Sequence, residues 1–347
     1  LASTETDEVG NFVIRGQSKV TAPADAQAVN TIAAGDTIVA GFAGTQTITT
    51  AVNDTAREFA EDVNGQSDHT GVTAKAATHA LLSTLNAAGT VDMKIGKQGA
   101  VGTGDATQVT VTATISDTTD LTALRDAINE VSGSTGVTAS FFEGDIGKVM
   151  LKDHDGDDIV LGDFNHSTSA STIAVQAYDF FGDSVSTTTS RTLTDGGADE
   201  DSITINGEVQ LSSNQAFALT STVADNFFGD SGATDTAYQS SLEKVGDIDL
   251  GSMTGAQKAL DVIDGAIDMV NTQRADLGAI SNRLDQTVNN LTNIVENTSA
   301  SKSHIKDANF AAETSKLTKA QILNQAATSM LAQANASKQT VLALLQN

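Results

Sequence analysis

The sequence predicts an α+β protein in which tandem small α+β and β-rich modules come first and long helices of the coiled-coil type follow. Three observations predict this order. Short Thr- and Val-rich segments with turn signals fill the first part, a helix–turn–strand pattern occurs there twice, and apolar residues recur at steps of three and four from about Met253. The predicted division is 1–115 and 116–250 for two outer modules, 251–300 for a coiled-coil helix and 301–347 for a terminal helix.

Several segments of residues 1–250 predict strands. Thr107–Ile115 alternates between apolar and polar residues, as a half-buried strand does. Lys148–Leu161 predicts two strands around Asp155-Gly156, and Asp201–Ser213 predicts two around Asn206-Gly207, because both dipeptides favour tight hairpin turns. Short helices are expected between these strands, at Thr55–Asn64, His79–Asn86 and Leu121–Val131.

An internal repeat supports the division into two modules. Thr55–Ala74 aligns with Asp120–Ala139 at an offset of 65 residues, and both copies end in the letters TGVTA. Each copy places apolar residues four apart on one helix face and then enters a small polar turn and a strand. Two copies are too few for a solenoid.

The last third of the chain has a heptad pattern. Its first apolar seam consists of Leu260, Ile263, Ile267, Val270, Leu277, Leu284, Val288, Leu291 and Val295, interrupted at Arg274 and Ser281. A seam this long predicts a coiled coil, in which polar interruptions set the register. A break is expected near Asn297–Ser303, and a thinner second seam follows. The candidate packing residues there are Phe310, Leu317, Ile322, Leu323, Met330, Leu331, Val341, Leu344 and Leu345.

The charge distribution limits the classes of partner that the chain can bind. The chain carries 44 acidic and 19 basic residues, and its net charge of −25 lies entirely in residues 1–250, because the rest is balanced. This charge argues against binding to nucleic acid and to anionic membranes. No apolar run reaches the roughly 20 residues that a membrane helix needs. The neutral last third is the part expected to pack against other protein, since interface cores are depleted in charge.

The sequence offers no catalytic, metal or cofactor site. It has no cysteine, and its five histidines show no zinc spacing, so solvated surface positions are expected for them. Asp153–Asp158 resembles a calcium loop only in part, because the glycine and the final glutamate of an EF-hand do not fall in place, and a hairpin turn is the simpler interpretation. Phosphate-loop, dinucleotide and nucleophile-elbow motifs are absent.

The last 66 residues resemble the C-terminal conserved region of bacterial flagellins. The family's blocks occur here in order: NRLDQTVNNL, IKDANFAAE, LTKAQILNQA, MLAQAN and VLALL, within Asn282–Gln346. The repeat that ends in TGVTA also resembles a short module of the variable regions of flagellins and hook-associated proteins. The resemblance implies an extracellular structural subunit of the flagellar filament, without enzymatic activity or cofactor, whose terminal helices pair as coiled coils while the acidic region is exposed.

The same resemblance implies partners: other flagellin subunits in a homopolymer, an export chaperone, and filament cap and junction proteins. The family begins with a helical region that does not precede Leu1, so the chain is expected to be part of a longer protein. Three alternatives stay open: a surface adhesion module that presents the acidic region, for example to polysaccharide, a hook–filament junction protein, and an enzymatic insert in the variable region.

Overall fold

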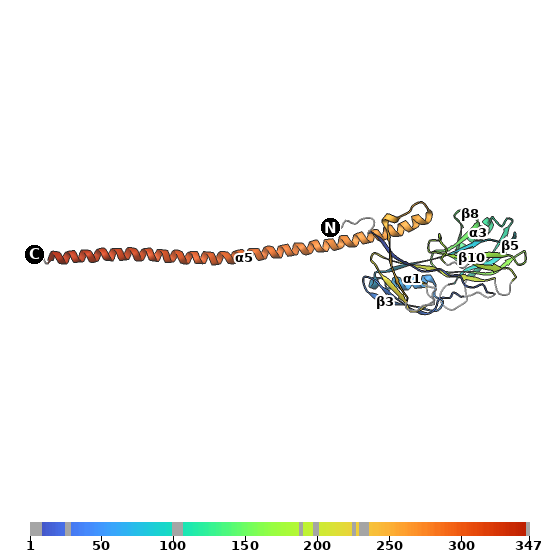
Figure 1. The fold of residues 1–347 in the computed structure, drawn as a ribbon, viewed down its shortest axis with the longest axis horizontal. Helices are drawn as coiled ribbons and strands as arrows, with labels where there is room; N and C mark the ends of the chain where they lie inside the picture. Colours follow the sequence, from blue (N-terminus) through green and yellow to red (C-terminus); the bar gives the residue numbers. More distant parts are fainter. Residues whose placement is uncertain are drawn as a thin grey trace. The chain divides into compact units, whose positions relative to one another are not determined.

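The computed structural model describes residues 9–24, 29–98, 107–186, 190–196, 201–223, 227–228 and 236–344. The chain divides into two compact units, Leu1–Thr272 and Gln273–Asn347. The first unit, called the body below, contains the sheets, the short helices and the start of one long helix; the second contains the rest of that helix (Figure 1). The predicted α+β class, with sheets first and a long C-terminal helix, is confirmed.

The largest sheet has eight strands, ordered β11–β10–β4–β13–β1–β16, with β8 beside β4 and β7 beside β8. Its strands are β1 (Gly10–Arg15), β4 (Thr73–Ser83), β7 (Thr138–Phe142), β8 (Asp145–Asp153), β10 (Thr172–Tyr178), β11 (Arg191–Thr194), β13 (Glu208–Ser213) and β16 (Ser241–Lys244). The long strand β4 connects the sheet, because its first half pairs with β13 and its second half lies between β8 and β10.

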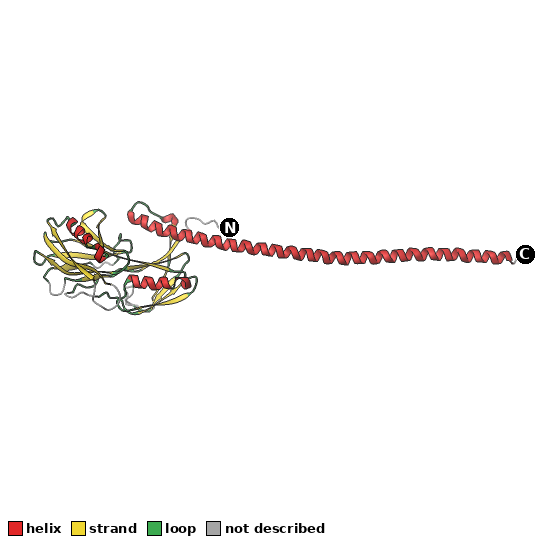
Figure 2. Cartoon of the chain, turned by 180° about the vertical axis from the view of Figure 1, so that it is seen from behind, coloured by secondary structure: helices red, strands yellow, loops and turns green. Residues whose placement is uncertain are grey.

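Two four-stranded antiparallel sheets complete the body. The strands of the body are yellow in Figure 2. One has the order β12–β9–β5–β6 and the other β15–β14–β2–β3. Their strands are β2 (Gly35–Ala40), β3 (Thr45–Thr50), β5 (Gly89–Gln98), β6 (Thr107–Ile115), β9 (Asp158–His166), β12 (Ile203–Ile205), β14 (Ala218–Ser221) and β15 (Thr236–Gln239). The predicted strand Thr107–Ile115 is therefore confirmed as β6.

Two of the three predicted short helices are confirmed. Helix α1 (Ala56–Gly65) begins at a capping box, in which Thr55 Oγ1 accepts from the Glu58 amide and the Glu58 carboxylate accepts from the Thr55 amide. Helix α3 (Thr122–Glu130) lies at the corresponding place in the second copy of the repeat. The other helical segments are α2 (Ser67–Thr70), α4 (Ser132–Thr135), the 3₁₀ turn η1 (Val245–Asp247) and α5 (Met253–Leu344).

Each of the two helices packs into its own hydrophobic core. Phe59 of α1 is buried with Ile14, Val39 and Leu219, and its ring lies 5.2 Å from that of Phe227. The apolar residues of α3 are buried in a second cluster with β5, β6, β8 and β9. Separate cores explain why each helix shows its own apolar face in the sequence.

The hydrogen bonds of the repeat recur 65 residues apart. The side-chain amide of Asn64 donates to Ala74 O and accepts from Ala74 N, both at 2.8 Å, and Asn129 makes the same pair of bonds with Ala139 at 2.8 Å. The intervening turns match as well, because Gly71 and Gly136 both adopt left-handed φ angles, of 73° and 71°. The shared letters in the two copies therefore preserve one local structure: the asparagine clamps the strand to the helix.

Asn129→Ala is expected to lower the free energy of unfolding by about 1–3 kcal/mol, because the amide and carbonyl of Ala139, a buried residue, lose their side-chain partners. Urea unfolding of the variant would measure this loss. Glu130→Ala, at the next and exposed position, is the matched control and should change stability by a few tenths of that amount at most. Equal stability of the two variants would contradict the clamp.

The predicted helix at His79–Asn86 is wrong, because this segment continues β4 to Ser83. Ala80 and Leu82 enter one hydrophobic cluster, whereas Leu81 enters another with Met150 and Tyr178. A strand that is buried on both faces is a continuous apolar run, and such a run cannot be told from a helix by periodicity.

The two predicted hairpins are also wrong, although their strands exist. β8 pairs with β4 and β7 whereas β9 pairs with β5 and β12, and β12 and β13 likewise belong to different sheets. Asp155-Gly156 and Asn206-Gly207 therefore lie where the chain crosses between sheets. The crossings touch, because a Cβ built on Gly207 would stand 2.9 Å from the carbonyl oxygen of Gly156.

Candidate assembly helix and its anchor

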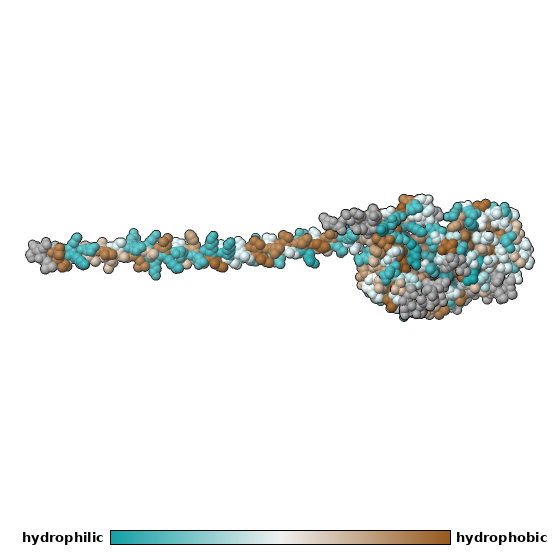
Figure 3. Space-filling view, in the orientation of Figure 1, coloured by the Kyte–Doolittle hydropathy of each residue, from teal (hydrophilic) through white to brown (hydrophobic). Residues whose placement is uncertain are grey.

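Beyond its first turns, helix α5 leaves its apolar side chains exposed. Every side chain that the structure describes between residues 273 and 342 is exposed, and apolar residues recur among them (brown in Figure 3). An isolated helix gains little from intrinsic propensity, so most of its stability must come from packing of an apolar face. The exposed stripe is therefore a candidate assembly surface.

The predicted packing residues lie on this exposed stripe. Their exposed fractions run from 36% for Val270 to 76% for Phe310. The set comprises Leu260, Ile263, Ile267, Val270, Leu277, Leu284, Val288, Leu291, Val295, Phe310, Leu317, Ile322, Leu323, Met330, Leu331 and Val341. The side chain of Leu344 and the whole of Leu345 lie outside the described residues. Whether these side chains pack against partners stays a prediction.

The predicted break near Asn297–Ser303 is wrong, because α5 is continuous from Met253 to Leu344. The segment loses the apolar seam, but it contains neither glycine nor proline. Loss of an apolar stripe removes packing, not the backbone hydrogen bonds of a helix. Ile280 and Ile294, 54% and 51% exposed, were missed as stripe residues; each stands three residues after a seam leucine and could have been found by that spacing.

The first turns of α5 are anchored on the body by small residues. Ala259, Val262 and Ala266 are buried, one position away from the seam residues Leu260, Ile263 and Ile267. A Cβ built on Gly265 would lie 2.6 Å from Cβ of Asn11, so the helix backbone rests directly on β1. This part of the helix thus has two apolar faces, one packed on the sheet and one exposed.

Polar contacts fix the same turns of the helix. Asp261 accepts from Lys75 Nζ at 2.6 Å and from Gln210 Nε2 at 3.2 Å, which ties it to β4 and β13. Lys258 Nζ lies 2.9 Å from Asp183 Oδ2, in the loop that follows β10. These contacts hold the helix in one orientation on the sheet, which leaves the seam face free.

The loop after β10, residues 179–186, packs against the start of α5 and is called the clasp below. The ring of Phe181 is buried there, with Lys258 at 5.0 Å and Arg15 at 5.1 Å from its centre. Glu208 of β13 is buried beneath the loop, where it accepts from Ser186 Oγ at 3.2 Å. Burial, together with the carboxylate of Asp179, raises the pKa of Glu208 from its ordinary value of 4.5 to about 8.

Glu208→Gln is expected to gain stability relative to the wild type as the pH rises. In the unfolded chain Glu208 loses its proton near pH 4.5, whereas the folded chain keeps it to about pH 8, so the wild type loses stability between these values. The difference in unfolding free energy between variant and wild type should shift by a few kcal/mol, on the order of 1.4 per pH unit, over that range. Urea unfolding at several pH values measures it, with Glu130→Gln as the exposed control; parallel pH profiles would contradict the assignment.

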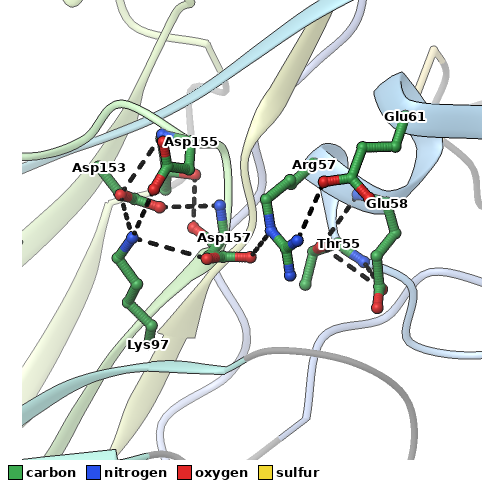
Figure 4. A network of polar contacts seen from close by, with 9 residues as sticks. Thr55, Arg57, Glu58, Glu61, Lys97, Asp153, Asp155 and Asp157 are labelled. Atoms are coloured by element: carbon green, nitrogen blue, oxygen red, sulfur yellow. Dashed lines mark hydrogen bonds and ion pairs between the residues drawn. The ribbon is translucent and has the colours of Figure 1, made fainter. Parts of the chain in front are cut away.

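The acidic loop Asp153–Asp158 holds an internal cation (Figure 4). Lys97 Nζ lies 2.6 Å from Asp153 Oδ1, 3.3 Å from Asp155 Oδ2 and 3.6 Å from Asp157 Oδ2. Arg57 of α1 adds a second contact, with its Nε 2.6 Å from Asp157 Oδ1. Three of the four carboxylates that suggested a calcium loop are thus paired with two basic side chains from other elements.

The expectation of solvated histidines is wrong for two of the five. His79 is 3% exposed and His166 is 4% exposed. Burial, with Lys152 nearby, lowers the pKa of His79 to about 3, so this imidazole is neutral at physiological pH. His166 Nδ1 accepts from the amide of Thr168 at 2.9 Å. Both histidines are core residues in strands, where the sequence shows no signal that separates them from surface histidines.

Two features are absent from the residues that the structure describes. Within these ranges no group of three or more His, Asp or Glu side chains is arranged to hold a metal ion. Among the same residues no helix is long and apolar enough to span a membrane.

Family comparisons match two parts of the chain. Residues 260–345 match the bacterial flagellin C-terminal helical region, and residues 98–153 match the flagellin hook IN motif. The first match covers the exposed stripe of α5. The second covers α3 and the second copy of the repeat, from the end of β5 to the end of β8.

Whole-sequence comparisons agree with these matches. The chain is 36% identical to the B-type flagellin of Pseudomonas aeruginosa over 244 residues, which cover 70% of this chain and 48% of that protein. It is 55% identical to Flagellin A of Vibrio cholerae over 102 residues, covering 29% of this chain and 27% of the relative. The chain therefore spans about half or less of these relatives. The flagellar cap protein FliD of Escherichia coli matches 79% of this chain and 67% of its own D1-D2-D3 structure, at 14% identity and a TM-score of 0.18.

Proposed function

We propose that this chain, which carries the C-terminal helical region of the bacterial flagellins, is a structural subunit of the extracellular flagellar filament. Flagellins are a structural family and not an enzyme family. The observation that carries the proposal is the exposed apolar stripe of α5, which coincides with the matched region. The stripe would be buried by coiled-coil packing against helices of the same protein and of neighbouring subunits in a homopolymer.

The geometry of the anchor supports helix pairing. The amide of Val245 donates to the carbonyl of Val9 at 2.9 Å, so the backbone near the start of β1 lies beside the η1 turn, which precedes α5. Val9 therefore lies near the region where α5 starts. A helix there could run along Leu260, Ile263 and Ile267, which the anchored side of α5 leaves exposed.

The finer organisation is part of the proposal. Residues 1–115 and 116–250 would form two outer modules built on the repeated helix–strand unit, residues 251–300 a coiled-coil segment, and residues 301–347 the innermost packing segment. The recurring asparagine clamps and the two hydrophobic cores support the tandem modules. An export chaperone and cap or junction proteins would be the other partners, as the family resemblance implies.

Deletion of residues 313–347 is expected to abolish polymerisation of the intact protein, because it removes most of the second seam. The body should stay folded, since none of its core residues is lost. Electron microscopy and sedimentation would measure polymer, and circular dichroism with thermal melting would report on the body. Filaments of normal length from the truncated protein would refute the proposal.

A further inference from the structure

A groove lies on the face of the eight-stranded sheet that α5 only partly covers. It encloses about 610 Å³ between α1, β4 and the first turns of α5, within the body. Ala76 and Ala77 of β4 form part of its floor, and Phe180 and Phe181 line one side with rings 5.1 Å apart at 82°. A second cavity of about 370 Å³ adjoins it and shares Lys152, Phe181 and Gln257.

Lys152 of β8 is a half-buried cation that lacks a counter-ion. Among the residues that the structure describes, no hydrogen-bond acceptor or carboxylate pairs with its ammonium group, and burial alone lowers its pKa. Five other lysines of the body each pair with a carboxylate: Lys75, Lys94, Lys97, Lys148 and Lys258. A partly desolvated charge without a partner is energetically unfavourable. Within the described residues, Lys152 stays unpaired although the chain carries 44 acidic residues against 19 basic ones.

The rest of the lining includes polar groups of both charges beside small apolar residues. Asn64, Glu61, Asp155 and Gln257 offer amide and carboxylate groups along its length. The fixed carboxylates can accept hydrogen bonds from hydroxyl groups. Phe180, which is half-buried, offers apolar surface to the C–H face of a sugar ring.

We propose that this groove binds an acidic saccharide, whose carboxylate pairs with Lys152 and whose ring lies against Phe180. A uronic acid unit combines three features that the lining residues can recognise: one carboxylate, several hydroxyls and an apolar ring face. The Lys152–carboxylate contact is a charge-assisted hydrogen bond in a site partly screened from water, where such contacts are strong. The groove borders the stripe of α5, because Leu260 lines it, whereas Lys152 and Phe180 lie outside the stripe.

The test is calorimetric titration of the full chain with trigalacturonic acid at low ionic strength. Saturable one-to-one binding is expected, with maltotriose, which lacks carboxylates, binding at least about tenfold more weakly. Lys152→Met should weaken binding of trigalacturonic acid by at least about tenfold, whereas Lys152→Arg keeps most of it. Lys94→Met, which removes an exposed lysine paired with Asp163 elsewhere, is the matched control.

Thermal melting separates a binding role from a structural one. Lys152→Met should melt at the wild-type temperature or above it, because it removes an unpaired, half-buried charge. Should this variant fail to fold, Phe180→Ala provides the second test and is expected to weaken the trisaccharide severalfold. Any of four results would overturn the proposal. Lys152→Met could bind trigalacturonic acid as tightly as wild type does, or the binding could fail to saturate. Wild type could also bind maltotriose, or triglutamate, a peptide with carboxylates but no sugar ring, as tightly as trigalacturonic acid.

Discussion

Leu331→Asp is expected to abolish filament assembly while the body keeps its wild-type melting temperature. Leu331 is 62% exposed on α5, within the region that matches the flagellin C-terminal helices, and it belongs to the predicted packing residues. If assembly buries this position, the new carboxylate loses its hydration without gaining a partner, at a cost of roughly several kcal/mol per subunit. Each 1.4 kcal/mol is about a factor of ten in an equilibrium constant, so the critical concentration should rise at least about a hundredfold.

The matched control for this variant is Gln325→Asp. It introduces the same charge on the same helix. Gln325 stands two positions after the seam residue Leu323, which places it on the opposite side of the helix. Polymer would be measured by sedimentation and electron microscopy over a range of protein concentrations. Assembly by Leu331→Asp at the concentration that suffices for Gln325→Asp would show that the stripe is not an assembly surface.

Local signals in the sequence predicted the elements that depend on local rules. The amphipathic helices α1 and α3 and the alternating strand β6 lie within about two residues of their expected bounds. The same is true of the repeat, because its asparagine clamp spans only ten residues. Where the structure depends on distant pairing, the local signal failed, as at His79–Asn86 and at the two dipeptides expected to form hairpins.

The candidate assembly helix also has a part that local signals predict and a part that depends on distant contacts. The exposed seam of α5 follows from apolar spacing along one helix, so the sequence could predict it. The anchor could not be predicted, because Lys75, Arg15 and Asp183 reach the helix or its clasp from strands and loops far away in the chain. Small residues such as Gly265 give no hydrophobic signal, although they permit the closest approach.

Lys97→Met is expected to destabilise the body by about 3–5 kcal/mol at neutral pH, because removal of one partner leaves a buried carboxylate without its counter-charge. Asp153 is 1% exposed, and Lys97 Nζ is its ion-pair partner at 2.6 Å. Urea unfolding of the variant measures the loss. Lys94→Met is the matched control: it breaks an ion pair with Asp163 in which both side chains are about half exposed, so it should cost less than about 1 kcal/mol.

A second substitution separates loss of charge balance from loss of packing. Asp153→Asn in the Lys97→Met background removes the uncompensated charge and should restore a large part of the stability, although Asp155 and Asp157 remain close by. The single variant should also become more stable relative to wild type as the pH falls, since burial raises the pKa of Asp153 and protonation removes the unpaired charge. If the double variant were as unstable as Lys97→Met at every pH, the lysine would act by filling space and not by balancing the three aspartates.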